Sequence, residues 1–326
     1  MNPIYFSTSR SCKRVPPSAK MGIFRDGGGK RVPPSAKTGT FRDGGGKRVP
    51  PSAKTGTFRD GGQKFAIFVT MFVDTHTHLN DEWLLPEADA AVQRALEAGV
   101  GRMIQADVDS RERASMWEVA SRHPGVVYNM LGLYPCSVTE GWKEEMDEVY
   151  RLAGRNGAVA LGEIGLDYHE GKEFAAQQKE VLRLQFELAA KLDLPVNIHL
   201  RDAWEDFFTV LEDCRHLHLR GDLHCFSGSY EVYERANRSG DFSVGIGGVI
   251  TFRNSGLAAV VSRIPLRHIL LETDAPYLAP VPYRGKRNES AYLPIVAAKV
   301  AEAKGVSVKE IEEVTTDNAF KLFNIQ

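Results

Sequence analysis

The sequence predicts an α/β protein, a (β/α)8 TIM barrel that follows a disordered N-terminal repeat tail. From residue 71 onward, eight short runs of apolar and β-branched residues alternate with longer segments of helical periodicity. Such alternation is typical of a parallel sheet with helical crossovers, and eight units in 256 residues match the usual size of this barrel. A doubly wound open sheet is the alternative, but no Gly-x-Gly-x-x-Gly follows the first strand.

The predicted strands are short and apolar, and several of them end in polar residues. In chain order they cover residues 72–78, 101–107, 126–133, 158–163, 195–200, 220–225, 242–248 and 268–274. The segments between them are predicted to be helices, because apolar residues recur there at helical spacing. In residues 173–193, for example, these are Phe174, Val181, Leu184, Leu188 and Leu192. The carboxyl ends of all eight strands then meet at one face, where barrel active sites lie.

Residues 1–64 have a different composition. A 17-residue unit, KRVPPSAKTGTFRDGGG with small variations, occurs three times over residues 13–63, starting at Lys13, Lys30 and Lys47. Paired prolines and runs of glycine leave each unit with too little apolar surface to offset the entropy of ordering. We therefore expect residues 1–64 to be disordered and residues 71–326 to form the barrel.

Three interpretations of this basic tail stay open. Its composition is similar to that of an organelle transit peptide, although the prolines and glycines oppose the amphipathic helix of such peptides. A basic tail also suits a nucleic-acid-binding arm. Near-identical tandem copies further suggest a duplicated nucleotide stretch read from an upstream start, with Met71 as the working initiator. The mass of the native protein tests this third interpretation, since an intact Met1 contradicts it.

Charge and cysteine content restrict the function classes. The net charge is −1, but residues 1–70 carry +11, which leaves −12 on residues 71–326 and opposes tight non-specific binding of duplex nucleic acid by the barrel. The cysteines lack C-x-x-C spacing, so a reducing, cytoplasmic location is expected; they are Cys12, Cys136, Cys214 and Cys225. The apolar run 65–73 is too short to span a bilayer, so no membrane association and no obligate protein partner are predicted.

Residues of metal-ligand type cluster at the ends of five predicted strands. Two histidines that are two positions apart on a strand share a face. Histidines and carboxylates at the ends of apolar strands are costly to bury unless they are paired or bind a metal. The candidates are His76 and His78 on the first strand, Glu163 on the fourth, His199 and His224 on the fifth and sixth, and Asp274 on the eighth, with Glu272 beside them. Nitrogen and oxygen ligands suit Zn, Mn, Fe or Mg, and two such ions favour hydrolysis.

These motifs, in this order, resemble the TatD family of metal-dependent deoxyribonucleases within the amidohydrolase-like barrels. The resemblance covers residues 71–326 and none of the repeats. It rests on DTHTHL from Asp74, GEIGLD from Gly162, IHLRDA from Ile198, HCFSG from His224, ETDAP from Glu272, RGKRN from Arg284 and TDNAFKLF from Thr316.

The resemblance implies a two-metal phosphodiesterase, with Mg, Mn or Zn as the ions. In this family assignment, His76, His78 and Asp274 hold the first ion, and His199 and His224 hold the second. Glu163 bridges both ions, and Asp274 accepts the proton of the attacking water. Glu272 and Arg201 are expected to support the ligands from behind.

The chain departs from the family after the third strand, where Gly-x-His-Pro-His is usual. Here the sequence is Gly132-Leu-Tyr-Pro-Cys136, so Tyr134 and Cys136 stand in place of both histidines. That region faces the substrate phosphate in the family, and Tyr134 keeps a hydrogen-bond donor there whereas Cys136 donates only weakly. We therefore expect metal binding to be retained and phosphate binding or substrate choice to be altered. Ser290 replaces a frequent proline.

A basic loop follows the eighth strand on the face where substrate enters a barrel. Arg284, Lys286 and Arg287 are three cations within four residues, and together with Tyr134 they are predicted to bind the substrate phosphate. A solvated loop is the structural alternative.

A local basic loop on an acidic body favours DNA ends or short oligonucleotides as substrate, and hence a 3′–5′ exonuclease acting on single strands or ends. Two other functions stay open. The same barrel suits a small-molecule amidohydrolase or lactonase, although such enzymes often carry a carboxylated lysine where this chain has Glu163. The third candidate is a non-catalytic nucleic-acid-binding protein that acts through its basic tail.

Overall fold

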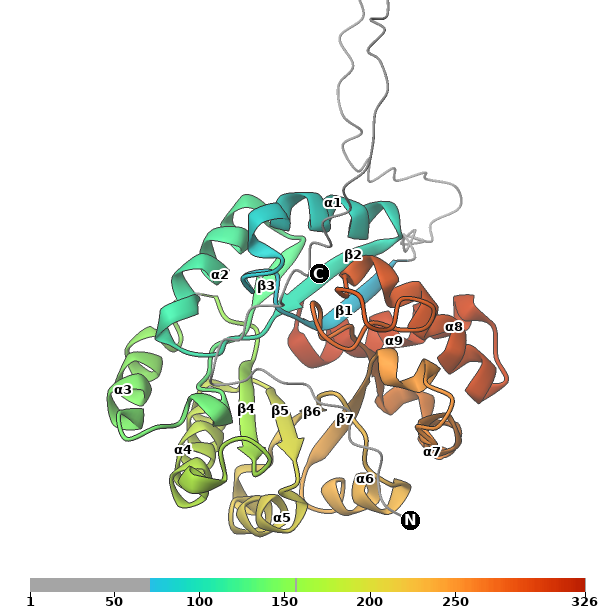
Figure 1. The fold of residues 1–326 in the computed structure, drawn as a ribbon. Helices are drawn as coiled ribbons and strands as arrows, with labels where there is room; N and C mark the ends of the chain where they lie inside the picture. The colour runs from blue at the N-terminus through green and yellow to red at the C-terminus, as the bar shows by residue number, and fades with distance from the viewer. Residues whose placement is uncertain (1–70, 156, 326) are drawn as a thin grey trace, which may run out of the picture. The chain divides into compact units, whose positions relative to one another are not determined.

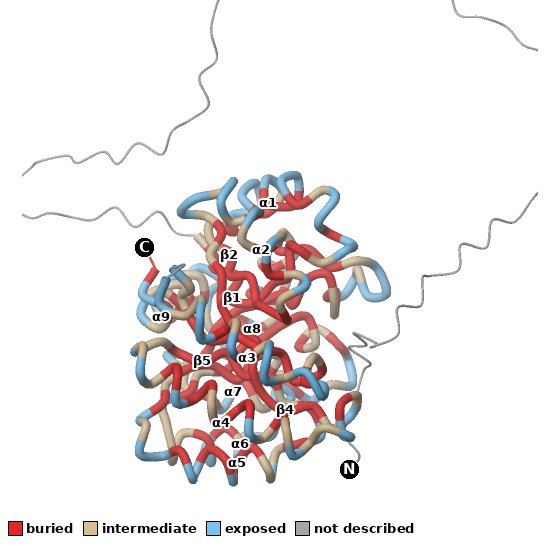
Figure 2. Tube along the Cα trace, turned by 90° about the vertical axis from the view of Figure 1, so that its left-hand side faces the viewer, coloured by how far each residue is buried: buried red, intermediate tan, exposed pale blue. Residues whose placement is uncertain are grey.

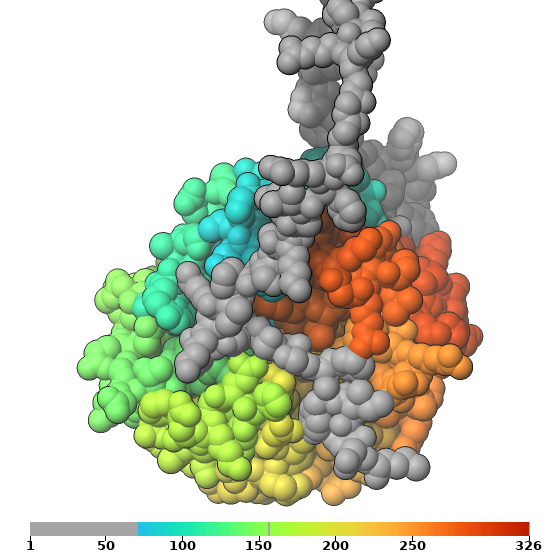
Figure 3. Space-filling model, in the orientation of Figure 1, coloured from blue at the N-terminus to red at the C-terminus, as the bar shows by residue number. Residues whose placement is uncertain are grey.

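The computed structural model describes residues 71–155 and 157–325. The predictions for residues 1–64 and their repeats therefore lie outside the described residues. Within this part of the chain, eight parallel strands alternate with helices, which confirms the predicted barrel (Figure 1). On the surface drawn in Figure 3, successive segments follow one another around the barrel from blue through green and yellow to orange.

The strands form two parallel sheets, ordered β1-β2-β3 and β4-β5-β6-β7-β8. Their bounds are β1 Phe72–Thr77, β2 Val100–Gln105, β3 Val127–Asn129, β4 Leu161–Asp167, β5 Val196–Arg201, β6 Arg220–Leu223, β7 Asp241–Ile246 and β8 Ile269–Leu271. Two parallel bridges join the sheets at their edges. Leu131 pairs with Leu161 between β3 and β4, and Thr77 pairs with Ala275 between β1 and the segment after β8. The eight strands thus close into a barrel.

Helices surround the strands, as the tube in Figure 2 shows by the exposed segments on the outside and the buried strands within. The α-helices are α1 Ala88–Glu97, α2 Ser110–Arg122, α3 Trp142–Leu152, α4 Ala175–Leu192, α5 Trp204–Asp213, α6 Tyr230–Ala236, α7 Leu257–Arg263, α8 Leu293–Lys304 and α9 Val308–Phe323. The 3-10 helices are η1 Leu85–Glu87, η2 Pro135–Ser137, η3 Lys172–Phe174, η4 Arg215–Leu217, η5 Gly248–Thr251, η6 Leu266–His268 and η7 Ser290–Tyr292.

Side-chain caps fix where several helices begin. Asp109 accepts from Arg111 N at 3.0 Å before α2, and Ser307 accepts from Glu310 N at 3.1 Å before α9. Each cap satisfies a backbone N–H that has no partner inside the helix. Helix α8 ends at Gly305, whose φ of +68° suits the left-handed conformation that ends many helices.

Three strands differ from their predicted bounds by three or more residues at one end or both, and the other five differ by one or two. The fourth was expected at residues 158–163, but β4 begins at Leu161 and continues to Asp167, because residues 164–167 pair with residues 198–201 of β5. Gly165 permits this pairing: its φ is +148°, and a Cβ atom there would collide with the backbone of His199. The expected strands 126–133 and 268–274 are shorter, ending at Asn129 and Leu271.

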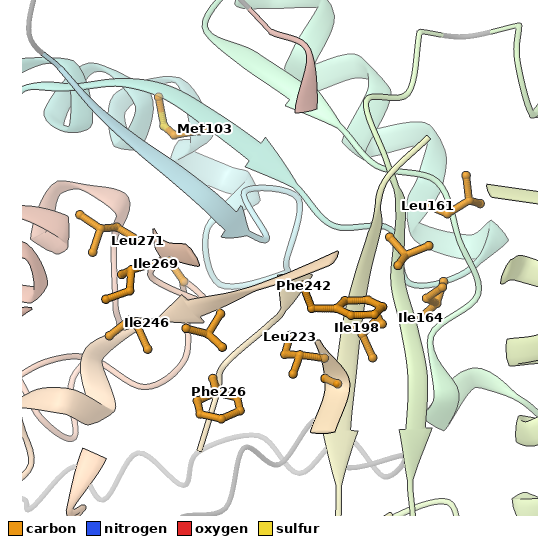
Figure 4. Packing of buried hydrophobic residues seen from close by; sticks show 14 of the residues in the cluster. Met103, Leu161, Ile164, Ile198, Leu223, Phe226, Phe242, Ile246, Ile269 and Leu271 are labelled. Carbon is orange, nitrogen blue, oxygen red and sulfur yellow. The ribbon is translucent and has the colours of Figure 1, made fainter. Parts of the chain in front are cut away.

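The core packs strand residues of the barrel against the helices. Figure 4 shows Ile198, Leu223 and Phe242, which come from the neighbouring strands β5, β6 and β7, close together in the main buried cluster. A smaller cluster packs Val73, Ile104 and Leu270 against Phe323 of α9. The polar side chains at the carboxyl ends of the strands are therefore held by rigid, fully packed elements.

No helix within residues 71–155 and 157–325 combines the length and the apolar character that a membrane span requires.

Candidate metal centre

The structure brings the six predicted metal ligands together at the carboxyl ends of five strands. His76 lies in β1, Glu163 in β4 and His199 in β5. The other three follow their strands directly or within a few residues: His78 after β1, His224 after β6 and Asp274 after β8. All six side chains are largely buried, with at most 9% of any residue exposed.

Three of these residues form one compact group. The Nε2 atoms of His76 and His78 lie 3.0 Å apart. Oδ1 of Asp274 lies 3.8 Å from the first and 3.4 Å from the second. Ligand atoms of the three residues therefore lie within 4.8 Å of one another, an arrangement that can hold an ion. This is the group to which the family resemblance assigns the first ion.

Glu163 stands between two pairs of histidines, and its two carboxylate oxygens face different pairs. Oε2 lies 3.6 Å from Nε2 of His76 and 3.7 Å from Nε2 of His78. Oε1 lies 2.9 Å from Nδ1 of His199 and 3.6 Å from Nε2 of His224. The carboxylate of Glu163 therefore lies between the two histidine pairs, with one oxygen toward each.

A buried amide fixes the orientation of His76. Nδ2 of Asn197 donates to both carboxylate oxygens of Asp222, at 3.0 and 3.1 Å. This leaves Oδ1 of Asn197 to accept from Nδ1 of His76, at 2.9 Å. With its proton on Nδ1, the imidazole presents the lone pair of Nε2 to the centre. Asn197 and Asp222 are completely buried, so the orientation is shielded from solvent.

Glu272 fixes His224 in the same way. Its Oε2 lies 3.2 Å from Nδ1 of His224, and its Oε1 accepts from the backbone N–H of Cys225 at 2.7 Å. Gly245 of β7 makes room for this carboxylate, since a Cβ atom at that position would collide with Glu272. Glu272, which was expected to support the ligands, therefore contacts His224 directly.

His199 is oriented by a carboxylate from the neighbouring strand. Oδ2 of Asp167, at the end of β4, lies 3.0 Å from Nε2 of His199, which leaves Nδ1 toward Glu163. Arg201, the other expected supporting residue, pairs with Glu170 at 3.1 Å. Burial raises the pKa of Asp167, but the hydrogen bond and the charge of His199 outweigh this effect and lower it. The charge of Arg201 adds a smaller lowering.

The electrostatics of the group favour a charged bridge. Burial raises the pKa of Glu163, but hydrogen bonds and charge from His199 and His76 outweigh it and hold the pKa well below its usual range. Burial lowers the pKa of His76, yet Glu163 and Asp274 raise it to about 9. For His224, burial and the nearby His76 lower the pKa to about 3, so this imidazole is neutral.

These residues fit divalent metal ions. Histidine ligands in metal sites usually donate their second ring nitrogen to a carboxylate or carbonyl acceptor, and here three histidines do so, to Asn197, Glu272 and Asp167. Each therefore presents an unprotonated nitrogen toward the centre once it is neutral. Nitrogen and carboxylate oxygen donors suit Zn, Mn, Fe or Mg.

Sequence reasoning missed the residues behind the ligands, although a signal was present. Asp74, Asn197 and Asp222 each lie two positions before a candidate histidine ligand, and residues two apart on a strand share a face. Oδ1 and Oδ2 of Asp74 accept from the backbone N–H and the hydroxyl of Thr273, at 2.9 and 2.6 Å, and so fix the segment that carries Asp274.

The predicted phosphate-binding residues do not form one group. Tyr134 is buried beside the centre, with its ring 5.1 Å from that of His199. Arg284 lies over the ring of Phe252 at 4.6 Å, and Lys286 lies 6.0 Å from the ring of Tyr283.

Arg287 belongs to an ion-pair network that ties η1 and α1 to the loop after β8. It donates to Glu87 at 2.6 Å and to Glu289 at 2.9 Å, and Arg94 donates to the same two carboxylates. Two guanidinium groups and two carboxylates thus alternate in a ring. The two carboxylates balance the charge of Arg287. The structure thus gives this residue a contact that joins two loops, whereas the sequence predicted that it binds phosphate.

Comparison with known proteins gives related matches. The chain matches the family described as "TatD related DNase" over residues 73–324. It is 37% identical over 256 residues to the uncharacterized metal-dependent hydrolase YabD of Bacillus subtilis, which covers 78% of this chain and 100% of that protein. It is 33% identical over 258 residues to the 3′-5′ ssDNA/RNA exonuclease TatD of Erwinia tasmaniensis, with 77% and 99% covered.

A solved structure agrees with these matches. The TatD homologue YJJV of Escherichia coli K12 superimposes with a TM-score of 0.71 at 30% identity, covering 78% of this chain and 98% of that one. Together with the buried donor set, the matches define the class of protein, a metal-dependent hydrolase built on a TIM barrel. More specifically, the chain belongs to the TatD family, as its motifs indicated.

Proposed function

We propose that this protein is a DNase, a 3′–5′ exonuclease that hydrolyses phosphodiester bonds at single-stranded ends with two divalent ions. The observation that carries the proposal is the division of the Glu163 oxygens between two histidine pairs. The exonuclease named TatD among the relatives supports this choice of substrate. When bound, a pair of ions lowers the pKa of a water molecule and neutralises charge that develops on the phosphate.

The residues would divide the work as follows. His76, His78 and Asp274 hold the first ion, and His199 and His224 hold the second. Glu163 would lie between the ions as a negatively charged ligand, and the low pKa of its carboxyl supports that role. Asp274, whose Oδ1 lies 3.4 Å from Nε2 of His78, would accept the proton of the attacking water at its carboxylate.

The surrounding groups would position the substrate. Tyr134, beside His199, and the basic loop of Arg284, Lys286 and Arg287 are proposed to contact the phosphate. DNA ends and short oligonucleotides remain the proposed substrates, Mg, Mn or Zn the proposed ions and the cytoplasm the proposed location.

The test is cleavage of a 5′-labelled single-stranded oligonucleotide by the full chain with Mg²⁺ or Mn²⁺. We expect a ladder that shortens from the 3′ end, is abolished by chelator, and falls at least about 1,000-fold in rate in Glu163→Gln, because that carboxylate contacts all four histidines. Glu140→Gln, an exposed carboxamide substitution away from the site, serves as the matched control.

Two other outcomes would contradict the proposal. An intact oligonucleotide with metal demonstrably bound would favour the small-molecule amidohydrolase or lactonase. Binding of the oligonucleotide that survives Glu163→Gln and is lost with residues 1–70 would favour the non-catalytic function of the basic tail.

A further inference from the structure

A line of aromatic rings leads from the metal centre to the surface. The ring of Tyr277, three residues after Asp274, lies 6.3 Å from the ring of His78 in an edge-on arrangement. The indole of Trp83 lies 6.0 Å from the ring of Tyr277. Trp83 is 47% exposed, which is the largest exposed fraction among the exposed large apolar residues within the part of the chain that the structure describes.

The backbone of Trp83 is held in place from two sides. Oδ1 of Asp81 accepts from the backbone N–H of Trp83 at 2.9 Å, and Oδ2 of Asp81 accepts from the hydroxyl of Tyr277 at 2.6 Å. One carboxylate therefore joins the two aromatic residues, although they come from opposite ends of the barrel sequence. Arg287 donates to the backbone carbonyl of Trp83 at 2.9 Å.

Residues next to Trp83 fix the loop that carries it. Leu84, directly after Trp83, is fully buried in the main core cluster, and Arg287 is itself fixed by Glu87 and Glu289. An exposed indole on such a loop lies ready for contact without an entropic cost of ordering. The loops after β1 and β8 both belong to the face of a barrel where substrate enters, so the indole is exposed on that face.

We propose that Trp83 and Tyr277 form a stacking platform for a base of the substrate strand, beside the centre that holds its phosphate. This inference rests on the proposed nuclease function and names the part of the substrate that is recognised. A nucleobase fits this position, because every base has a flat π-face that can stack on an exposed indole. The acidic Asp81 and Glu82 beside the indole disfavour a second phosphate at this position.

The platform has a measurable consequence. Removal of an aromatic side chain on which one base stacks weakens binding of the nucleic acid by roughly five- to 150-fold. Trp83→Ala should therefore lower kcat/KM for an oligonucleotide by that factor, mainly through KM. Trp83→Phe keeps a π-face and should recover most of the loss.

The test uses hexathymidylate and a series of hexamers in which one base at a time, counted from the 3′ end, is replaced by an abasic sugar. With the unaltered full chain, one abasic position should lower kcat/KM by about the factor given above. With Trp83→Ala, that position should no longer matter. The control is Tyr150→Ala, which removes an aromatic residue that is 42% exposed on the outer helix α3, and it should behave like the unaltered protein.

A second readout separates failure of this inference from failure of the proposed function. Quenching of tryptophan fluorescence by hexathymidylate in Mg²⁺ reports contact with the indole whether or not cleavage occurs. Quenching that disappears in Trp83→Phe supports the platform even if no oligonucleotide is cleaved, in which case the nuclease function alone fails. Equal losses for Trp83→Ala on the normal and all abasic substrates, or unchanged quenching in Trp83→Phe, would overturn the platform.

Discussion

His76 shows most clearly how single residues prepare the centre. Its Nδ1 faces Asn197 at 2.9 Å, and Asn197 is in turn fixed by Asp222. An imidazole that is held in this way presents one nitrogen to the centre in a defined tautomer, whereas an unsupported ring rotates and changes tautomer. The buried amide and carboxylate thus act on the metal through His76, without reaching it themselves.

Replacing this pair by Asn197→Leu together with Asp222→Leu should weaken binding of one metal ion by roughly 10- to 100-fold. Both residues are changed because a lone buried carboxylate would be left unpaired and would destabilise the fold. Competition with a chelator measures the affinity, and nitrogen chemical shifts of His76 report the tautomer. An unchanged affinity with an unchanged tautomer would show that Asn197 has no positioning role.

Metal binding should become tighter as the pH rises from 6 to about 9. In the metal-free protein, burial lowers the pKa values of His76 and His199, but nearby carboxylates outweigh this effect and raise both to about 9. Both rings are therefore protonated on both nitrogens, and positively charged, at pH 7. A metal ligand is neutral imidazole, so binding must release these protons, and a rise in pH favours their release.

Calorimetric titration in buffers with different protonation enthalpies measures this release. We expect net release of protons at pH 7 that declines above pH 9. His224 contributes none, because its pKa is already near 3. Affinity that falls with rising pH over this range would contradict the protonation states described above.

The clustering of the candidate ligands and the place of Glu272 beside them could be predicted from the sequence, whereas the pairing of Asn197 with Asp222 could not. Histidines and carboxylates at the ends of apolar strands are recognisable as candidate ligands, because their burial requires a partner or a metal. Asn197 and Asp222 lie earlier in their strands, where a single polar residue among apolar neighbours does not reveal its partner. Only the register, which places Asn197 opposite Asp222, shows that the two meet.

At the scale of elements, buried ion pairs hold the loops that surround the centre. Arg113 of α2, which is 3% exposed, donates to Asp107 at 2.7 Å, to Glu148 of α3 at 3.0 Å and to the carbonyl of Gly132 at 3.3 Å. Asp107 in turn accepts from the backbone N–H of Gly132 at 3.1 Å. This network joins α2, α3 and the loop that carries Tyr134.

Arg113→Met should lower the free energy of unfolding by about 3–5 kcal/mol, since it leaves the carboxylate of Asp107 buried without its ion partner. Denaturation in urea measures the change. The matched control is Arg122→Met on the same helix, whose surface ion pairs contribute about 0–1 kcal/mol. Equal effects of the two substitutions would show that Arg113 stabilises no more than a surface arginine does.

The bounds of β4 illustrate which properties of elements escape prediction. The apolar residues 158–160 suggested an early start, but they precede the strand, and Glu163 lies inside it rather than at its end. The actual bounds depend on pairing with β5 and on the close approach that Gly165 allows. Such a close backbone approach depends on both strands, so the sequence of one strand alone does not predict it.

For the molecule as a whole, the alternation of strands and helices was sufficient to predict the barrel, because eight units close most simply into this fold. The closure itself depends on two bridges, Thr77 with Ala275 and Leu131 with Leu161, which no local pattern reveals. The family match begins at residue 73, just inside β1.

Deletion of residues 1–70 should therefore leave the melting temperature within about 2 °C and kcat/KM within about twofold, because the matched region and β1 lie beyond the deletion. Thermal unfolding and the oligonucleotide assay, with the full chain as control, measure both. Loss of all nucleic-acid binding in the shortened protein would instead assign the function to the tail.

We propose that Glu163 lies between two ions, one at each histidine pair. Anomalous diffraction from crystals of the protein grown with Mn²⁺ tests it most directly. We predict two strong peaks, one among His76, His78 and Asp274 and one beside His199 and His224, with an oxygen of Glu163 next to each. A single peak, or two peaks of which only one touches Glu163, would contradict the bridging role of Glu163.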